Sequence, residues 1–183
     1  MKTEALERYL NSFGKQIVKQ AKGNLSAAGK GGALSNSIDF FVIRKGGSIT
    51  VRFKMNSYGT FVDKGVSGNN KTKSFKDYKG KVIKSPYKFG TGSSKVGKAK
   101  GGMSGIMAKW VKKKGFQWRD KNGRFMSHKS MGYIIARSIY SKGIQGISFF
   151  QKPLMLGMKQ FSSKFGKAIA DDIVNSLRQQ KIA

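Results

Sequence analysis

The sequence predicts an α+β fold: a small antiparallel sheet packed against an N-terminal helix and long C-terminal helices, with a long basic loop inserted. Apolar residues recur at three- and four-residue spacing at both ends of the chain, and they alternate with polar residues over residues 48–55. The chain has 183 residues, of which 38% are hydrophobic and 11% aromatic, enough for one domain with a substantial core. We therefore expect a single α+β domain over residues 1–183.

The N-terminal stretch predicts an amphipathic helix that ends at Gly23. Thr3 can cap its first turn, and Glu4 and Glu7 suit the positive end of the helix dipole. Glycine after an apolar stripe is a natural stop signal. The residues expected to share the apolar face are Leu6, Leu10, Phe13, Ile17 and Ala21.

Two strands joined by a tight turn are predicted next. Residues 38–44 and 48–55 are rich in β-branched and aromatic side chains, and residues 45–47, Lys-Gly-Gly, are typical of a hairpin turn. In the second strand apolar residues alternate with polar or basic ones, which indicates one buried face and one basic, solvent-exposed face. The apolar residues are Ile49, Val51, Phe53 and Met55.

The periodicity disappears between residues 67 and 102, where Gly, Lys, Ser and Asn dominate. A loop of this length within a compact domain is uncommon and is usually functional or disordered. We therefore expect residues 67–102 to form an extended Gly/Lys-rich arm within the domain, with a weak hairpin near residues 81–89.

After the arm, the sequence predicts a helix followed by a hairpin. Ser104 can cap a helix over residues 105–114, which Gly115 ends. The turn residues 120–123 separate two short runs, which indicates a small hairpin over residues 116–126.

Three further elements complete the chain. A helix is predicted from Ser127 or Ser130 to Tyr140, and residues 144–150 are expected to form a strand that returns to the sheet. Pro153 suits the first turn of one last helix that extends to about residue 180. Its expected apolar face consists of Leu154, Met158, Phe161, Phe165, Ile169, Ile173 and Leu177.

Charge is the most unusual property of the chain. Lys and Arg number 37 against 8 Asp and Glu, for a net charge of +29. Between Lys64 and Lys129, nineteen basic residues stand against two acids, Asp77 and Asp120, a local balance of +17. Because so much positive charge repels itself, an anionic partner or a larger assembly is expected to accompany it.

We predict that the basic residues of this stretch contact an anion, the DNA backbone or a neighbouring subunit. No recognised nucleic-acid-binding motif is present, so contact with DNA is expected to be insensitive to sequence. The predicted contact residues are Lys71, Lys73, Lys76, Lys79, Lys81, Lys84, Lys95, Lys98, Lys100, Lys112, Lys113, Lys114, Arg119, Lys121 and Arg124.

Aromatic residues are interleaved with the basic ones, and they have two interpretations. Basic residues around Phe116, Trp118 and Phe125 suit phosphate contacts combined with base stacking. Alternatively, the aromatic side chains belong to the core and the lysines form a solvated face. We favour the core for Trp110, Trp118 and Phe125, because they lie at the ends of elements where they can close over the sheet.

The residue inventory argues against catalysis. Asp171 and Asp172 are adjacent, so on a helix they point about 100° apart and cannot form a facing pair. We expect both to be solvated helix charges. With one histidine, no cysteine and no cluster of acids to hold Mg²⁺, we predict no enzymatic activity, no metal and no cofactor.

The chain also lacks the signals of a membrane or secreted protein. No segment approaches the roughly 20 apolar residues of a membrane span, and the N-terminus has no apolar signal core. The absence of cysteine fits synthesis in a reducing cytoplasm. We therefore expect a soluble protein without membrane contact.

Several short motifs occur in a set order. Residues 34–38 read LSNSI, residues 58–65 read YGTFVDKG, and residues 149–154 read FFQKPL. This order resembles the small head–tail connector and tail-completion (neck) proteins of tailed bacteriophages. In that family a Leu–Ser–Ile segment leads into the first strand, before a Tyr–Val–acid–Gly stretch and a Phe–Pro start of the last helix. Residues 118–127 and 131–140 also resemble virion proteins of phages that infect Bacteroidetes-type hosts.

The resemblance implies an α+β protomer in a ring of six or twelve, with no catalysis. It further implies portal, neck and tail proteins as partners, and a virion protein made in the host cytoplasm. Asp63 stands where the family more usually has glutamate, and the insert over residues 67–102 is long for the family. We therefore expect a structural subunit that joins head to tail and lines or surrounds the DNA channel. The alternative is a sequence-independent nucleic-acid-binding protein that acts outside the particle.

Overall fold

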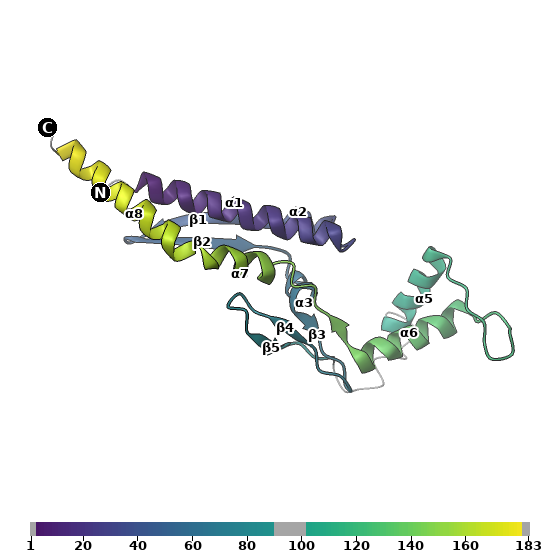
Figure 1. Ribbon diagram of the computed structural model, residues 1–183. Coiled ribbons are helices and arrows are strands. Elements are labelled where there is room, and N and C mark those ends of the chain that lie inside the picture. The colour runs from purple at the N-terminus through teal and green to yellow at the C-terminus, as the bar shows by residue number, and fades with distance from the viewer. Residues whose placement is uncertain (1–2, 90–101, 181–183) are drawn as a thin grey trace. The chain divides into compact units, whose positions relative to one another are not determined.

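A computed structural model describes residues 3–89 and 102–180 of the protein. It has small antiparallel sheets, an N-terminal helix and C-terminal helices, so the predicted α+β class is confirmed (Figure 1). The chain divides into two compact units. Unit 1 comprises Met1–Asp63, Lys76–Ile83 and Ile147–Ala183, and unit 2 comprises Lys64–Phe75 and Lys84–Gly146.

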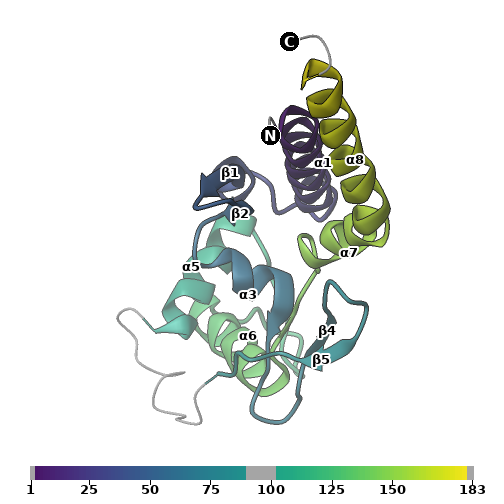
Figure 2. The same ribbon diagram turned by 90° about the vertical axis from the view of Figure 1, so that its left-hand side faces the viewer.

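Unit 1 is built around a long N-terminal helix. Figures 1 and 2 both show α1 side by side with α8. Its elements are α1 (Glu4–Ala27), α2 (Ala33–Ser37), β1 (Asp39–Lys45), β2 (Ser48–Lys54), α7 (Gln151–Lys159) and α8 (Phe161–Gln180), with α3 (Gly59–Lys64) ending one residue beyond it.

The apolar stripe of α1 forms the core of unit 1. All five side chains predicted for this face, from Leu6 to Ala21, are buried. The helix continues through Gly23 to Ala27, so the predicted stop at Gly23 was wrong. Leu25 extends the stripe and is fully buried, and the Asn24 side-chain amide donates a hydrogen bond to the Phe149 carbonyl (3.2 Å). These tertiary contacts hold the last turn of the helix in place.

The predicted hairpin of β1 and β2 is confirmed. Both glycines of its turn, Gly46 and Gly47, have positive φ angles (55° and 80°), which suits a two-residue turn between twisted strands. Ile49, Val51 and Phe53 are partly buried and pack on the core, and the residues between them are exposed, as the alternation predicted.

Helix α1 and strand β1 approach each other closely at Gly14. The Phe40 ring lies where a side chain of residue 14 would be, since a Cβ atom there would stand 2.2 Å from Phe40 Cδ2. The absence of a side chain at position 14 therefore allows the sheet to pack directly against the helix.

The C-terminal region forms two helices, not the single helix predicted. The break falls at Gln160, between α7 and α8. Gly157 packs against Ile17 and Phe13, and the Phe161 ring stands edge-on to Phe13 with the ring centroids 5.1 Å apart. The break allows both sides of the bend to pack on the same part of α1. Pro153 lies in the first turn of α7, as predicted.

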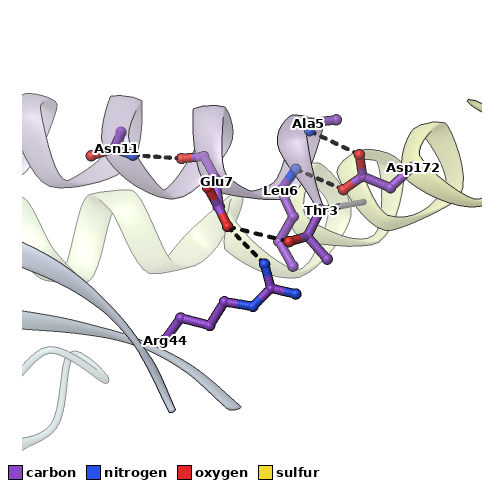
Figure 3. A network of polar contacts seen from close by, with 7 residues as sticks. All are labelled: Thr3, Ala5, Leu6, Glu7, Asn11, Arg44 and Asp172. Carbon is purple, nitrogen blue, oxygen red and sulfur yellow. Dashed lines mark hydrogen bonds and ion pairs between the residues drawn. The ribbon is translucent and has the colours of Figure 1, made fainter. Parts of the chain in front are cut away.

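A buried carboxylate on α8 caps the start of α1. Asp172 is 3% exposed, and its two oxygens accept hydrogen bonds from the backbone N–H groups of Ala5 (2.8 Å) and Leu6 (3.0 Å) (Figure 3). These N–H groups have no partner within the helix, and a negative charge suits this end of its dipole. The prediction that Asp172 is solvated was therefore wrong. Thr3, the predicted cap, instead donates its hydroxyl hydrogen to Glu7 (3.3 Å).

A second buried carboxylate, that of Asp63, joins the chain before unit 2 to the chain after it. Asp63 is 3% exposed and accepts a hydrogen bond from the backbone N–H of Phe150 (2.8 Å). The backbone N–H groups of Ile147 and Ser148 donate to the carbonyls of Val62 and Asp63, each at 3.0 Å. Residues 58–63 and 149–154, far apart in sequence, are thus held together within unit 1.

Unit 2 contains a short antiparallel pair, β3 (Gly65–Val66) with β6 (Ile144–Gln145). Residues 144–150 were predicted to form a strand of the main sheet, which was wrong. Only two of them pair, and they pair with β3. The following backbone turns at Ser148, whose φ is 50°, to make the contacts of Asp63 and enter α7.

The predicted arm contains a hairpin in its described part. Strands β4 (Ser74–Lys76) and β5 (Val82–Lys84) form a two-stranded sheet, earlier in the chain than the hairpin predicted at residues 81–89. The Asp77 carboxylate closes the turn by accepting from the N–H groups of Lys79 (2.9 Å) and Lys81 (2.8 Å). Residues 90–101 of the predicted arm lie outside the described residues.

The largest packing contact in unit 2 is between α5 (Met103–Lys114) and α6 (His128–Lys142). Val111 of α5 and Met131 of α6 are buried. The helices touch at Gly132, where a Cβ atom would stand 2.5 Å from the Ala108 backbone nitrogen. Gly115 ends α5 in the left-handed conformation, and the Ser127 side chain caps α6, both as predicted.

We predict that Asp172→Ala lowers the free energy of unfolding of unit 1 by about 1–3 kcal/mol, because one buried and one partly buried N–H group lose their acceptor. Both tryptophans are in unit 2, so unfolding in urea is best followed by far-UV circular dichroism, a signal to which the long helices α1 and α8 of unit 1 contribute together with the helices of unit 2. Asp171→Ala is the matched control: it removes the same charge from an exposed neighbouring position on α8. Equal effects of the two substitutions would show that the cap contributes nothing beyond charge.

Candidate nucleic-acid interface

Residues 116–126, here named the basic hairpin, connect α5 to α6. Arg119 and Phe125 form an antiparallel bridge. The Met126 N–H donates to the Trp118 carbonyl and the Asp120 N–H to the Arg124 carbonyl, both at 2.8 Å. The predicted hairpin is therefore confirmed, and it extends beyond the ends of the two helices (Figure 1).

The turn of the basic hairpin is organised by Asp120. Its carboxylate accepts hydrogen bonds from the backbone N–H groups of Asn122 and Arg124, both at 2.9 Å. Gly123 has a φ of 76°, a conformation that favours glycine. Asp120 is the only acid among residues 112–126, and its carboxylate is engaged with the backbone of the turn.

Arg119 connects the turn to the opposite strand. Its Nη1 donates to the Gly123 carbonyl (2.9 Å), and its guanidinium carbon lies 4.2 Å from the centre of the Phe125 ring. This cation–π contact orders both side chains at the surface. The hairpin is thus held by contacts of its own side chains.

The aromatic side chains around the hairpin are exposed, which makes the prediction that they pack in the core wrong. Trp110 and Trp118 are each 41% exposed, Phe116 is 42% exposed and Phe125 62%. A single hairpin of two very short strands has no second layer to cover it, and the contact between α5 and α6 is filled by other side chains. The Trp110 and Phe116 rings lie against each other with their centroids 5.2 Å apart.

Basic residues flank these aromatic residues along the chain. Lys112, Lys113 and Lys114 form the last turn of α5, where positive charge also favours the helix dipole. Arg119, Lys121 and Arg124 belong to the hairpin, where no helix dipole accounts for them. Every residue from 112 to 125 is exposed, and six of them are basic against one acid. We call residues 110–126 the aromatic–basic surface.

The other predicted contact residues do not all join this surface. Lys71, Lys73 and Lys84 lie in unit 2, in or beside the strands β4 and β5. Lys76, Lys79 and Lys81 belong to unit 1. Lys95, Lys98 and Lys100 lie outside the described residues. The structure therefore brings together, within one unit and one continuous segment, the six predicted residues of the aromatic–basic surface.

Sequence reasoning missed that the tryptophans are available at the surface. One signal could have found them: a hairpin of about ten residues between two helices is too short to be covered on both faces, so its aromatic residues face solvent. It also missed the buried carboxylates of Asp63 and Asp172, whose partners are far away in the sequence.

Other kinds of site were sought in the described part of the chain. Within residues 3–89 and 102–180, no group of three His, Cys, Asp or Glu residues could hold a metal ion. Nor is any helix among the described residues both long and apolar enough to cross a membrane. A cavity of about 340 Å³ in unit 1 is lined mainly by polar side chains of α1 and of the α7–α8 bend, including Tyr9, Gln16 and Lys164. Burial raises the pKa of Tyr9 above its usual value.

Comparisons with protein-family models, with curated proteins and with solved structures found no match for this chain. The chemistry of the surface is therefore the guide to function. Lysine and arginine side chains bind phosphates, and exposed aromatic rings stack on nucleic-acid bases. The aromatic–basic surface offers both on a frame fixed by the contacts of Arg119 and Asp120.

We predict that both tryptophans are accessible to a small quencher. Acrylamide should quench the fluorescence of Trp110 and Trp118 substantially in the folded protein, though less than that of a free indole, because each residue is 41% exposed. The variants Trp110→Phe and Trp118→Phe each leave one tryptophan, so the two can be measured separately. Strong protection of Trp118 in the folded protein, removed by urea, would contradict the exposed position.

Proposed function

We propose that the protein is a structural virion protein, a ring-forming subunit of the neck or tail of a tailed bacteriophage. In this role it joins the portal and head to the tail and surrounds the DNA channel, with portal, neck and tail proteins as its neighbours. The proposal assigns it no catalytic step and no cofactor.

The contact between two of the resembling motifs supports this proposal most directly. Asp63, the acid of the YGTFVDKG segment, accepts a hydrogen bond from the backbone of Phe150, at the start of the FFQKPL segment. Both segments would be expected to lie together if they belonged to one shared fold. Asp63 also places a negative charge at the start of α7, where the carboxylate of either an aspartate or a glutamate favours the helix dipole.

The charge of the chain supports a position close to DNA. A ring multiplies the net charge of +29 by the number of its subunits, and such a ring is stable only if its surroundings neutralise it. DNA phosphates, or acidic surfaces of neighbouring proteins, would supply the negative charge. Lysine and arginine contacts to the DNA backbone would be independent of sequence, as a channel through which a whole genome passes requires.

The exposed aromatic residues favour a second candidate function. A sequence-independent nucleic-acid-binding protein that acts outside the particle would also combine basic side chains with aromatic stacking surfaces. The observation that favours this second function is the exposure of Trp110 and Trp118. The two functions differ in oligomeric state, which decides between them.

We predict that the purified full-length protein forms closed oligomers of six or twelve copies in native mass spectrometry and analytical ultracentrifugation. Added salt should favour the ring, because it screens the repulsion between subunits. A protein that stays monomeric at every concentration, with and without DNA, and that binds DNA tightly, would contradict the ring and support the second candidate.

We also predict that the affinity for duplex DNA depends on the lysines at the end of α5. For the double variant Lys112→Gln/Lys113→Gln, the slope of log K against log salt should become shallower by about two, since each lost phosphate contact removes about 0.9. The control Lys15→Gln/Lys19→Gln makes the same change of charge at exposed positions of α1, in unit 1. Equal slopes for the two variants would mean that the affinity for DNA depends only on the net charge of the protein, and that Lys112 and Lys113 do not contact phosphates specifically.

A further inference from the structure

We propose that the aromatic–basic surface is a binding site for single-stranded nucleic acid, in which Trp118 stacks on a base and the surrounding lysines and arginines bind phosphates. This inference goes beyond the proposed function, because a subunit around duplex DNA needs only the phosphate contacts. It does not depend on the ring, since the site lies within one segment of one unit.

The aromatic–basic surface is rich in exposed aromatic side chains. Four large aromatic residues, Trp110, Phe116, Trp118 and Phe125, are each 41% to 62% exposed within a segment of seventeen residues. Scattered exposed apolar residues are ordinary, but a concentration of aromatic ones on a surface marks an interaction site. Covering the flat face of an indole ring with a ligand is favourable, because it removes a large apolar area from water.

The charge of the aromatic–basic surface indicates which kind of ligand it binds. The same segment carries six basic residues and one acid, and the carboxylate of that acid, Asp120, is bonded to the backbone of the turn. Charge complementarity therefore favours a polyanion over an ordinary protein surface. Among polyanions, single-stranded nucleic acid presents flat bases together with phosphates, whereas a duplex keeps the faces of its bases stacked inside.

Much of the aromatic–basic surface is ordered before a ligand binds. The hairpin is already fixed by the Asp120 turn, by the hydrogen bond from Arg119 to Gly123 and by the Arg119–Phe125 contact. Trp110 and Phe116 rest against each other. Because these groups are ordered before the ligand arrives, little conformational entropy is lost when they bind it.

Arg119 has a double part in this site. The guanidinium of Arg119 covers one face of the Phe125 ring, and Phe125 is still 62% exposed. The guanidinium remains charged while it stacks, so it can also bind a phosphate. Trp118 precedes Arg119 in the chain, so this segment carries an exposed ring and a cationic side chain at successive residues.

The test is a titration of tryptophan fluorescence in the full-length protein. The probes are thirty-nucleotide oligo(dT) and oligo(rU), a DNA duplex with the same number of phosphates, and heparin, a polyanion without bases. We expect both single strands to quench the tryptophan emission and to bind tighter than the duplex, and heparin to bind without comparable quenching. Oligo(dT) and oligo(rU) both present phosphates together with unpaired bases. Tighter binding of either one than of the duplex therefore supports the site.

The substitutions separate stacking from charge. Trp118→Ala should weaken oligo(dT) binding by about 5- to 150-fold, the range found for the loss of one base–aromatic stack, and should leave heparin binding unchanged. Trp118→Phe retains a ring and should recover most of the affinity, which excludes misfolding as the cause. Tyr58→Ala is the control, because Tyr58 is 43% exposed but belongs to unit 1.

Two outcomes would overturn the site. If oligo(dT), duplex and heparin bind equally and Trp118→Ala changes none of them, the surface recognises charge alone. If oligo(dT) does not quench the emission, and Trp118→Ala instead abolishes self-association of the protein, the aromatic residues form a protein contact. Because fluorescence reports the site in rings and in monomers alike, failure of the ring and failure of this site are distinguishable.

Discussion

Burial of the apolar stripe on α1 is the interaction on which unit 1 depends. A two-stranded hairpin is marginal by itself in water, and α7 is too short to be stable alone. Each of these elements covers part of the stripe: the β1–β2 hairpin lies against Gly14 through Phe40, and α7 and α8 cover Phe13 and Ile17. The first and last segments of the chain are thus folded together, and neither has a core without the other.

Two buried carboxylates stabilise the starts of two helices of unit 1, α1 and α7. Asp172 holds the start of α1 from the C-terminal helix, and Asp63 holds the start of α7 from the segment before unit 2. In both cases a short acidic side chain supplies the acceptors that the first turn of a helix lacks. With Asp77 and Asp120, which close turns, four of the 8 acids are engaged with backbone N–H groups, in a chain with 37 basic residues.

How far the sequence could predict this molecule depended on the range of the interactions. The stripe of α1, the Gly-Gly turn, the end of α5 at Gly115 and the Ser127 cap of α6 are local patterns, and they were predicted correctly. The predicted Ser104 cap was wrong, because α5 begins at Met103 and Ser104 lies inside it. The contact between Asp172 and Leu6 spans 166 residues, so adjacency to Asp171 was a poor guide to its burial. The six basic residues of the candidate site were visible from composition. That Trp118 faces solvent beside them was not, because exposure depends on which elements cover a hairpin, and periodicity does not reveal that.

The backbone pairing around Asp63 has one more consequence. Ile147 donates to Val62 and Ser148 to Asp63, so the polypeptide leaves unit 1 and finally rejoins it at neighbouring residues. This pairing holds the two ends of residues 64–146 close together, so that these eighty-odd residues resemble a domain inserted into a loop of unit 1. Lineages could lengthen, shorten or replace the α5–α6 portion while the scaffold that carries it stays intact. The basic α5–α6 portion and unit 1 could then change in sequence at different rates.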